Sequence, residues 1–260
     1  MNLMHYILQV NIYLVVFYGF YRLFLANETY FILNRIYLLG AGLLSLTIPF
    51  VRLEWFKSQS MTQPVYATVG QLNDYVYMTI VPEQENALDI GQVLSIVYLA
   101  GVVFSSIRLT IRLVKIRYIL RKRSKGSAFS FFRHKVVDSN LPQSKVIDSH
   151  EELHVKQMHS VDILFFEMIG LFNWFNPIIY LYQRTIRNVH EYLADEEAAR
   201  FQGDKEQYAL LLLSNALGVS PSNLTNSFFN KSLIKKRIYM LHKQRSRKTA
   251  VLKYGLFLPL

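Results

Sequence analysis

Three long apolar runs constrain this chain most. They cover residues 7–21, 36–51 and 90–107, and none of them contains a charged residue. A helix of about 20 mostly apolar residues crosses the hydrocarbon core of a bilayer, so the third run qualifies directly. The first two reach that length when flanking residues are counted, because Arg22 and Arg35 can extend their charged ends to the interface. The runs therefore predict three membrane-spanning helices.

The composition supports this interpretation. Hydrophobic residues make up 52% of the chain and charged residues 18%, against about 25% charged residues in a typical soluble domain. One alternative is a signal peptide at the first run, which has neither the basic start nor the small-residue cleavage site of such a peptide. The other is a soluble protein with three buried helices. The lack of cysteine in the sequence excludes disulfides, thiolate metal sites and cysteine catalysis.

The charges are distributed unevenly around the predicted spans. Residues 108–125 contain eight basic and no acidic residues, whereas residues 52–89 contain two basic and five acidic residues. By the positive-inside rule, residues 108–125 are cytoplasmic and residues 52–89 form an extracytoplasmic loop. The amino terminus is then also extracytoplasmic. Much of the net charge of +11 then faces anionic lipid. Membrane lipid is therefore an expected partner, and direct binding to nucleic acid is not expected.

These patterns divide the chain into three parts. Residues 1–125 are predicted to form the membrane region and residues 126–248 a cytoplasmic domain. Residues 249–260 are apolar again, and we expect them to be the start of a fourth span that is cut short. If this expectation holds, a sensor domain could lie beyond residue 260.

The domain at 126–248 begins with a predicted short strand at residues 129–137, and a helix is expected around His150. Asn176 and Pro177 form a helix cap followed by a first-turn proline. A helix is therefore predicted from Pro177 to Phe201, with Gly203 just past its end.

The sequence His150-Glu-Glu-Leu-His154 is an HExxH pattern. Residues four apart share one face of a helix, so both imidazoles can reach one cation. Neutral imidazole nitrogens suit Zn²⁺, and Glu151 is placed to take a proton from an attacking water. The pattern arises by chance in roughly one chain in a hundred of this composition. It therefore needs support from a second feature.

The predicted helix at 177–201 provides that feature, because it carries Glu191 and Asp195 one turn apart on one face. Catalytic zinc sites use three protein ligands, which makes Glu191 the candidate third ligand. Asp195 would then accept the free N–H of a liganding histidine. The competing interpretation is a solvated helix face with ion pairs from these two carboxylates to Arg184, Arg187 and Lys205.

Three nearby features receive a more modest interpretation. His159 follows His154 by five residues and turns away from the metal-facing side, so a polar or structural role is expected. His190 points about 100° away from Glu191 and is left out of the ligand set, although a hydrogen bond to a reaction intermediate stays open. The basic cluster from Lys235 to Lys248 precedes the last apolar run, which indicates the cytoplasmic flank of a membrane helix.

Four motifs together point to a known family. They are His150-Glu-Glu-Leu-His154 with His159 and Asp162, Trp174-Phe-Asn-Pro177, His190-Glu-Tyr-Leu-Ala-Asp195 and Ser232-Leu-Ile-Lys-Lys-Arg-Ile-Tyr-Met240. With the three spans and the basic linker, the chain resembles the BlaR/MecR-type antirepressor metallopeptidases, bacterial membrane signal transducers of the zincin class. The resemblance implies that His150, His154 and Glu191 hold zinc and that Glu151 activates water. Nothing in the chain resembles the penicillin-binding sensor of the beta-lactam members.

The expected fold is mainly α: a polytopic membrane protein with a zincin-like metallopeptidase domain, made of helices and a small β element, between the third and fourth spans. The expected location is the inner membrane of a bacterial cell, with the metallopeptidase domain in the cytoplasm. The hypothesis is a zinc endopeptidase that converts an extracytoplasmic signal into cleavage of itself or of a transcriptional repressor. The strand at 129–137 could pair with the substrate backbone. Two alternatives are a housekeeping protease of the CAAX-processing or HtpX type, and a non-catalytic receptor or scaffold.

Overall fold

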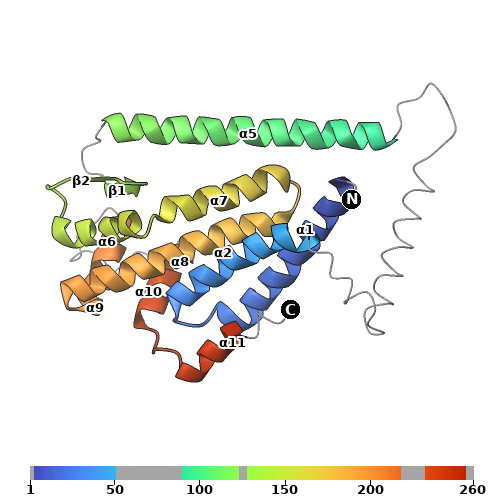
Figure 1. Cartoon of the computed structure of the whole chain (residues 1–260). Helices are drawn as coiled ribbons and strands as arrows, with labels where there is room; N and C mark the ends of the chain where they lie inside the picture. Colours follow the sequence, from blue (N-terminus) through green and yellow to red (C-terminus); the bar gives the residue numbers. More distant parts are fainter. Residues whose placement is uncertain (1–2, 51–89, 123–127, 218–231, 256–260) are drawn as a thin grey trace.

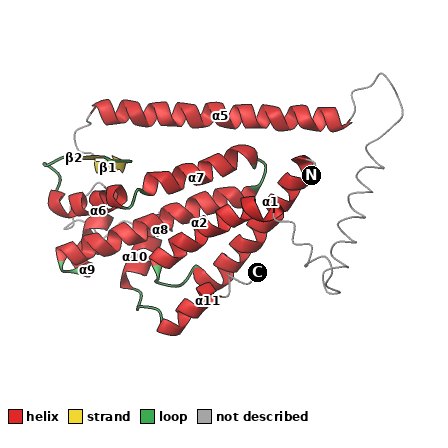
Figure 2. Ribbon diagram, in the orientation of Figure 1, coloured by secondary structure: helices red, strands yellow, loops and turns green. Residues whose placement is uncertain are grey.

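The computed structural model describes residues 3–50, 90–122, 128–217 and 232–255 (Figure 1). This part of the chain is mostly helical and contains one two-stranded sheet (Figure 2). The predicted loop at 52–89 lies outside the described residues. The elements are α1 (Leu3–Phe20), a π-helical turn η1 (Tyr21–Leu25), α2 (Phe31–Thr47), the 3₁₀ turn η2 (Ile48–Phe50), α5 (Ile90–Lys122), β1 (Ala128–Phe131), β2 (His134–Val137), α6 (Ser144–Lys156), α7 (His159–Phe172), α8 (Pro177–Gln202), α9 (Lys205–Leu217), α10 (Ser232–His242), the 3₁₀ turn η4 (Lys248–Val251) and α11 (Leu252–Gly255).

The described residues include three helical segments that are long and apolar enough to cross a membrane, at Met4–Leu25, Phe31–Phe50 and Ile90–Ile119. The three apolar helices predicted from the sequence are thereby confirmed. The third helix differs from the prediction in its length, because α5 continues without a break to Lys122. Most of the basic segment that starts at Arg108 is therefore part of this helix and not a separate linker.

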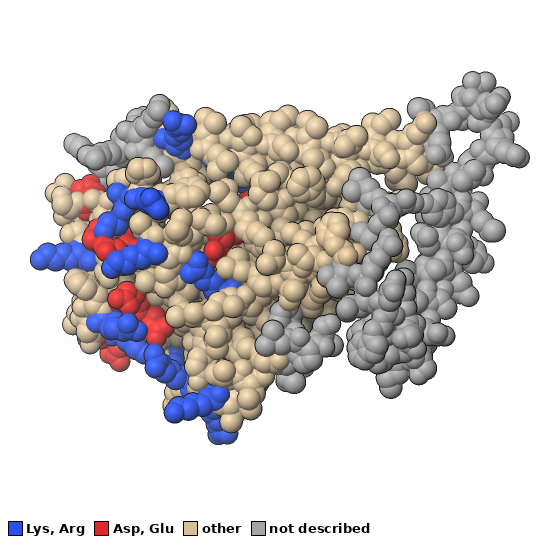
Figure 3. Space-filling view, viewed as in Figure 1, with Lys and Arg blue, Asp and Glu red and all other residues tan. Residues whose placement is uncertain are grey.

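Charged and uncharged surfaces separate along the molecule. In the face shown in Figure 3, the charged side chains gather toward the end where Figure 1 places α6, α9 and α10. At the opposite end, where α1 and α5 begin, the described residues visible on this face include almost no charged side chains. This separation suits a molecule with one end in a bilayer and the other in water.

One hydrophobic core joins the first two apolar helices to α7 and α8. Tyr182 and Ile186 of α8 are completely buried, and they belong to the same cluster as Leu14 of α1, Leu38 of α2 and Phe166 of α7. The buried residues of α8 recur every three or four positions, which is the period of a helix with one apolar face. The elements that precede residue 125 and those that follow it thus share a core, and the predicted boundaries at 125 and 248 stay predictions.

A second, smaller core lies toward the charged end. It contains Ala198 and Ala199 of α8, Val146 of α6, Tyr208 of α9 and Leu241 of α10. Because α8 contributes to both cores, its middle turns lie between the apolar helices and the smaller helical cluster. This is the stretch that carries Glu191.

Helix α8 begins and ends with the signals that predicted it. The Oδ1 atom of Asn176 accepts a hydrogen bond from the backbone N–H of Ile178 at 2.8 Å, which satisfies one of the free donors in the first turn. Gly203 follows the last residue, Gln202, with φ of 79°, a left-handed conformation that costs glycine little. The helix extends one residue beyond the predicted end at Phe201.

The turn between α7 and α8 is fastened to two of the apolar helices. The side-chain amide of Asn176 donates to Oδ1 of Asn11 on α1 at 2.6 Å. Trp174 donates through Nε1 to the carbonyl of Tyr98 on α5 at 3.3 Å. A Cβ atom at Gly101 would lie 2.1 Å from the Trp174 ring, so this contact requires a glycine. The Trp-Phe-Asn-Pro sequence therefore positions α8 against the apolar helices.

The single strand predicted at 129–137 is wrong in one respect: the segment is an antiparallel hairpin. Strand β1 pairs with β2, with Phe131 opposite His134. Phe132, in the two-residue turn between them, has φ of 53°, and its N–H donates to the hydroxyl of Ser160 at 2.8 Å. The apolar run concealed the turn, because a phenylalanine at positive φ carries no glycine or asparagine signal.

The described end of the chain packs near the connection between α1 and α2. Lys253 of α11 forms an ion pair with Glu28 at 2.5 Å, and the hydroxyl of Tyr254 donates to Oδ1 of Asn34 at 2.8 Å. Residues 256–260 lie outside the described part, so the expected fourth span stays a prediction.

Candidate metal centre

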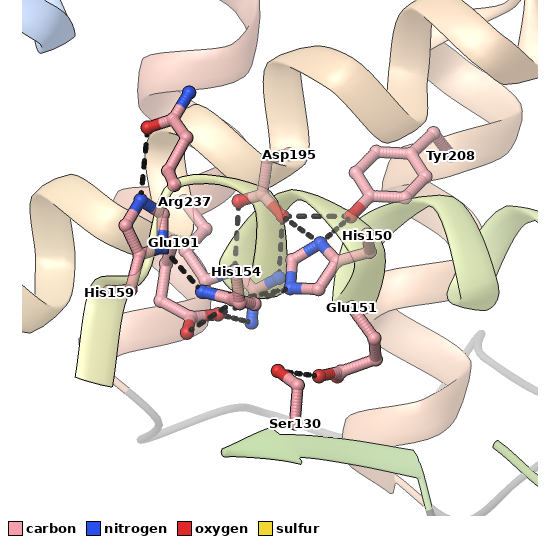
Figure 4. A network of polar contacts seen from close by, with 10 residues as sticks. Ser130, His150, Glu151, His154, His159, Glu191, Asp195, Tyr208 and Arg237 are labelled. Atoms are coloured by element: carbon pink, nitrogen blue, oxygen red, sulfur yellow. Dashed lines mark hydrogen bonds and ion pairs between the residues drawn. The ribbon is translucent and has the colours of Figure 1, made fainter. Parts of the chain in front are cut away.

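Helices α6 and α8 bring together the two histidines of the HExxH pattern and the glutamate that the sequence proposed as their partner. One ligand atom from each of His150, His154 and Glu191 lies within 4.8 Å of the others. The two Nε2 atoms are 3.3 Å apart. The Glu191 carboxylate lies 3.6 Å from Nε2 of His150 and 3.7 Å from Nε2 of His154. Figure 4 shows the three side chains turned toward one another.

His150 is held through its other ring nitrogen. Its Nδ1 lies 3.0 Å from the hydroxyl of Tyr208, and that hydroxyl donates to Oδ1 of Asp195 at 2.8 Å. Since the single proton of Tyr208 goes to the carboxylate, Nδ1 of His150 must be the donor to the Tyr208 oxygen. Asp195 itself is 3.5 Å from this nitrogen. The carboxylate expected behind a liganding histidine is present, and Tyr208 mediates its shorter contact.

Glu151 points from α6 toward strand β1. Its Oε2 atom accepts a hydrogen bond from the hydroxyl of Ser130 at 2.6 Å (Figure 4). Burial raises the pKa of Glu151 above its ordinary value, and the bond from Ser130 opposes that rise. A carboxylate with a raised pKa beside a metal site is better suited to accept and return a proton near neutral pH.

An arginine that is largely shielded from water joins the two carboxylates of α8. Arg237 of α10 lies 2.8 Å from Glu191 through Nη1, and its Nε donates to Oδ2 of Asp195 at 2.8 Å. Burial alone would raise the pKa of Glu191, but the bond from His150 and the charge of Arg237 lower it to about 2. The Arg237 side chain is 12% exposed, so this ion pair is largely removed from water.

Arg237 corrects two interpretations of the sequence. The competing interpretation paired the α8 carboxylates with Arg187 and Lys205, but Arg187 lies 3.8 Å from Glu167 and Lys205 donates to the carbonyl of Leu241. The basic cluster that begins at Lys235 was interpreted as the cytoplasmic flank of a membrane helix, and Arg237 departs from that role because its side chain turns inward to Glu191 and Asp195. A signal was available, since Arg237 stands three and four residues before the buried Met240 and Leu241.

The ligand set fits a divalent cation such as zinc. Nitrogen ligands at about 2.0–2.1 Å from a tetrahedral zinc lie about 3.3–3.4 Å from one another, and the two Nε2 atoms are 3.3 Å apart. Burial lowers the pKa of His154 to about 4, with the nearby His150 acting in the same direction. Together with the low pKa of Glu191, this leaves a neutral imidazole and an anionic carboxylate near neutral pH. These are the protonation states that zinc requires.

His159 and His190 lie beside the three candidate ligands and outside the group. Nδ1 of His159 is 2.7 Å from Nδ1 of His154, and the rings of His159 and His190 stack at 3.9 Å. Nε2 of His190 lies 2.7 Å from Asp162, which also pairs with Arg35 of α2 at 2.6 Å. Burial lowers the pKa of His159 far below its ordinary value, so the ring is neutral.

A cavity of about 420 Å³ opens beside the candidate ligands. Helices α6, α7, α8 and α10 line it, and His154 and Glu191 are among the lining residues. Its further lining residues are Ile163, Arg184, Arg187, Asn188, His190 and Leu233. The volume is in the range of sites that hold a small ligand or a few side chains.

Sequence reasoning located the three candidate ligands and Glu151, but it did not find Tyr208 or Ser130. Tyr208 precedes Leu211 and Leu212 at helical spacing, which marks it as part of the buried face of α9. Nothing in that pattern distinguishes a tyrosine that binds a histidine from one that only packs. Ser130 depends on where the hairpin docks, which is a tertiary contact that local sequence does not encode.

Three apolar helices pack against a helical domain in which two histidines of α6 and a glutamate of α8 form a group that could hold a metal ion. With Glu151 next to the first histidine, these features define a candidate membrane metallopeptidase. Comparison with known families agrees: residues 139–241 match the family described as BlaR1 peptidase M56. Over this segment the match confirms the resemblance to the BlaR/MecR-type family that the motifs predicted. No curated protein and no solved structure gave a significant match.

Proposed function

We propose that this protein is a multi-pass membrane zinc endopeptidase that transduces an extracytoplasmic signal. It would do so by cleaving itself, a transcriptional repressor or both, on the cytoplasmic side of a bacterial inner membrane. The observation that carries the proposal is the convergence of His150, His154 and Glu191 inside the segment that matches the M56 family. The family match over residues 139–241 supports the zincin-like character proposed for residues 126–248.

His150, His154 and Glu191 would hold the zinc ion. When bound, zinc supplies Lewis acidity, which polarises a peptide carbonyl and acidifies water. Glu151 accepts the proton of the attacking water and returns it to the leaving amine, so it ends each cycle as it began. Asp195 and Tyr208 hold His150 in place through the contacts described above. The cavity that reaches His154 and Glu191 gives room for substrate side chains beside the scissile bond.

The proposed orientation is supported by the arrangement of the apolar helices. In Figure 1 the start of α1 and the start of α5 lie at one end, and the connection between α1 and α2 lies toward the other. That second end carries α6, α10 and most of the charged side chains seen in Figure 3. A cytoplasmic location for this end agrees with the positive-inside rule, since the basic residues at the end of α5 lie there too.

Zinc content tests the metal site. We expect about one zinc per chain in the detergent-purified wild type and in Glu151→Gln, because Glu151 is not a ligand. Glu191→Ala removes one of three ligands, so its zinc content should fall clearly below that of the wild type. The measurement is elemental analysis after dialysis without chelator. A wild-type protein that holds no zinc would instead favour a receptor or scaffold without catalytic activity.

The hairpin offers a second test, because β1 is the strand that contacts Glu151. Ala128 of β1 and Val137 of β2 are opposite each other, so a proline at either position disturbs the hairpin equally. If substrate pairs with β1, Ala128→Pro should reduce cleavage of labelled casein more than Val137→Pro, with zinc content unchanged in both. Equal cleavage by the two variants would show that substrate does not pair with β1.

A further inference from the structure

We propose that Arg35, on the second apolar helix, is a positioning residue for the metal centre. Through Gln157 and His159 it fixes His154 in the tautomer that presents the Nε2 lone pair to the ion. The inference rests on the proposed function, because it concerns a zinc ligand. It adds a residue from a predicted membrane span to the parts of the molecule that the site requires.

The first step is the contact between Arg35 and Gln157. Nη1 of Arg35 donates to the side-chain Oε1 of Gln157 at 3.0 Å, and Nη2 donates to the backbone carbonyl of Gln157 at 2.7 Å. A guanidinium group has donors only. The Gln157 side-chain atom that faces Arg35 must therefore be the amide oxygen, which removes the usual ambiguity between the two ends of a glutamine amide.

The second step fixes His159. Its Nε2 lies 3.1 Å from the same oxygen of Gln157. Because that oxygen can only accept, Nε2 of His159 carries a hydrogen. The ring is 2% exposed, and the positively charged Arg35 already donates to the shared oxygen. A second buried cation there would be costly, so the ring is neutral and its Nδ1 is a lone pair.

The third step reaches the ligand. Nδ1 of His154 is 2.7 Å from Nδ1 of His159. Since the His159 nitrogen is an acceptor, Nδ1 of His154 must be the donor. His154 then has no hydrogen on Nε2, the atom that faces Nε2 of His150 and Glu191. A partner that holds the other ring nitrogen is how proteins set the tautomer and orientation of a liganding histidine.

A second set of contacts links Arg35 to the His159 ring. Arg35 also donates to both carboxylate oxygens of Asp162, through Nε at 2.6 Å and Nη2 at 3.2 Å. Asp162 in turn accepts from Nε2 of His190 at 2.7 Å, whose ring stacks on His159 with an angle of 6° between the planes. Asp162 and His190 are 5% and 2% exposed. Arg35 thus both sets the hydrogen-bond direction and holds the His159 ring in its plane.

The test uses the full chain in detergent, with zinc affinity measured by competition against a chelating dye. Gln157→Leu removes the shared oxygen and leaves the pair of Arg35 with Asp162, whereas Gln157→Glu restores an acceptor for both partners. We expect zinc affinity to fall about 10- to 100-fold in Gln157→Leu and in Arg35→Met, as for other partners of liganding histidines. Gln157→Glu should stay close to the wild type.

Arg112→Met is the matched control, because Arg112 lies on another apolar helix and pairs with Glu167 of α7 at 3.5 Å, away from the ligands.

A second readout separates positioning from packing: the ¹⁵N chemical shifts of selectively labelled histidine, recorded without metal. They should show His154 protonated at Nδ1 in the wild type, in Gln157→Glu and in Arg112→Met, and a mixture of tautomers in Gln157→Leu. An Nδ1–H tautomer of His154 that persists in Gln157→Leu, with unchanged zinc affinity, would overturn the inference. A wild type that keeps this tautomer but binds no zinc would contradict the proposed function alone.

Discussion

Replacing Glu151 with glutamine is expected to reduce peptide cleavage by roughly 10²- to 10⁴-fold, the usual contribution of a positioned acid–base group. Glutamine keeps the size of the side chain and an oxygen that can accept from Ser130, so the local packing around β1 and α6 should survive. Only the proton acceptor is lost. The measurement is the initial rate of self-cleavage in proteoliposomes, together with the rate of cleavage of labelled casein.

The matched control is Glu152→Gln, one residue further along α6. Glu152 pairs at the surface with Lys135 at 3.1 Å and with Lys156 at 2.9 Å, and it takes no part in the proposed chemistry. Its loss should leave cleavage within about twofold of the wild type, because exposed ion pairs contribute little. Equal rates for Glu151→Gln and the wild type would show that another group moves the proton.

Replacing Arg237 with alanine should destabilise the metal-free protein by about 3–5 kcal/mol, the usual cost of removing one partner of a buried ion pair. Glu191 and Asp195 would be left without the cation that offsets their burial. Zinc bound to Glu191 would compensate part of this charge, so added zinc should raise the unfolding midpoint more in the variant than in the wild type. The measurement is denaturant unfolding in detergent, with chelator and with zinc.

Lys236→Ala provides the comparison, because Lys236 is the exposed neighbour of Arg237 on α10. Its substitution should change the free energy of unfolding by less than about 0.5 kcal/mol. A chelator-treated Arg237→Ala protein as stable as the wild type would mean that the charge of Arg237 does not stabilise the ionised Glu191. That result would contradict the low pKa of Glu191.

The sequence predicted the helices well because their signals are local. Each signal determines the conformation of residues close to it in the sequence. This holds for the three apolar runs, the cap at Asn176 and the glycine after Gln202. The hairpin was missed for the opposite reason: its turn contains Phe132 at positive φ, and a contact with Ser160 on α7 holds that turn. A tertiary hydrogen bond can stabilise a backbone conformation that the local sequence does not favour.

The residues of the candidate site also fall into those with a local sequence signal and those that depend on tertiary packing. His150, His154 and Glu191 were predicted because HExxH spacing and a second acidic helix are visible along the chain. Tyr208 and Arg237 come from helices that reach the site only after α8 has packed in both cores. Arg237 was assigned to a basic flank because its sequence neighbours are lysines, whereas its inward direction depends on the phase of α10.

The length of α8 has a mechanical consequence. At 26 residues, with a rise of about 1.5 Å per residue, it is a rod of about 39 Å. Tyr182, near one end, is packed among the apolar helices, and Glu191 stands nine residues further along, about 13 Å away. A tilt of about 5° around Tyr182 would displace the Glu191 backbone by about 1 Å, twice the tolerance of roughly 0.5 Å that a catalytic constellation allows. The spacing between Glu191 and the two histidines therefore depends on the angle at which α8 packs against the apolar helices.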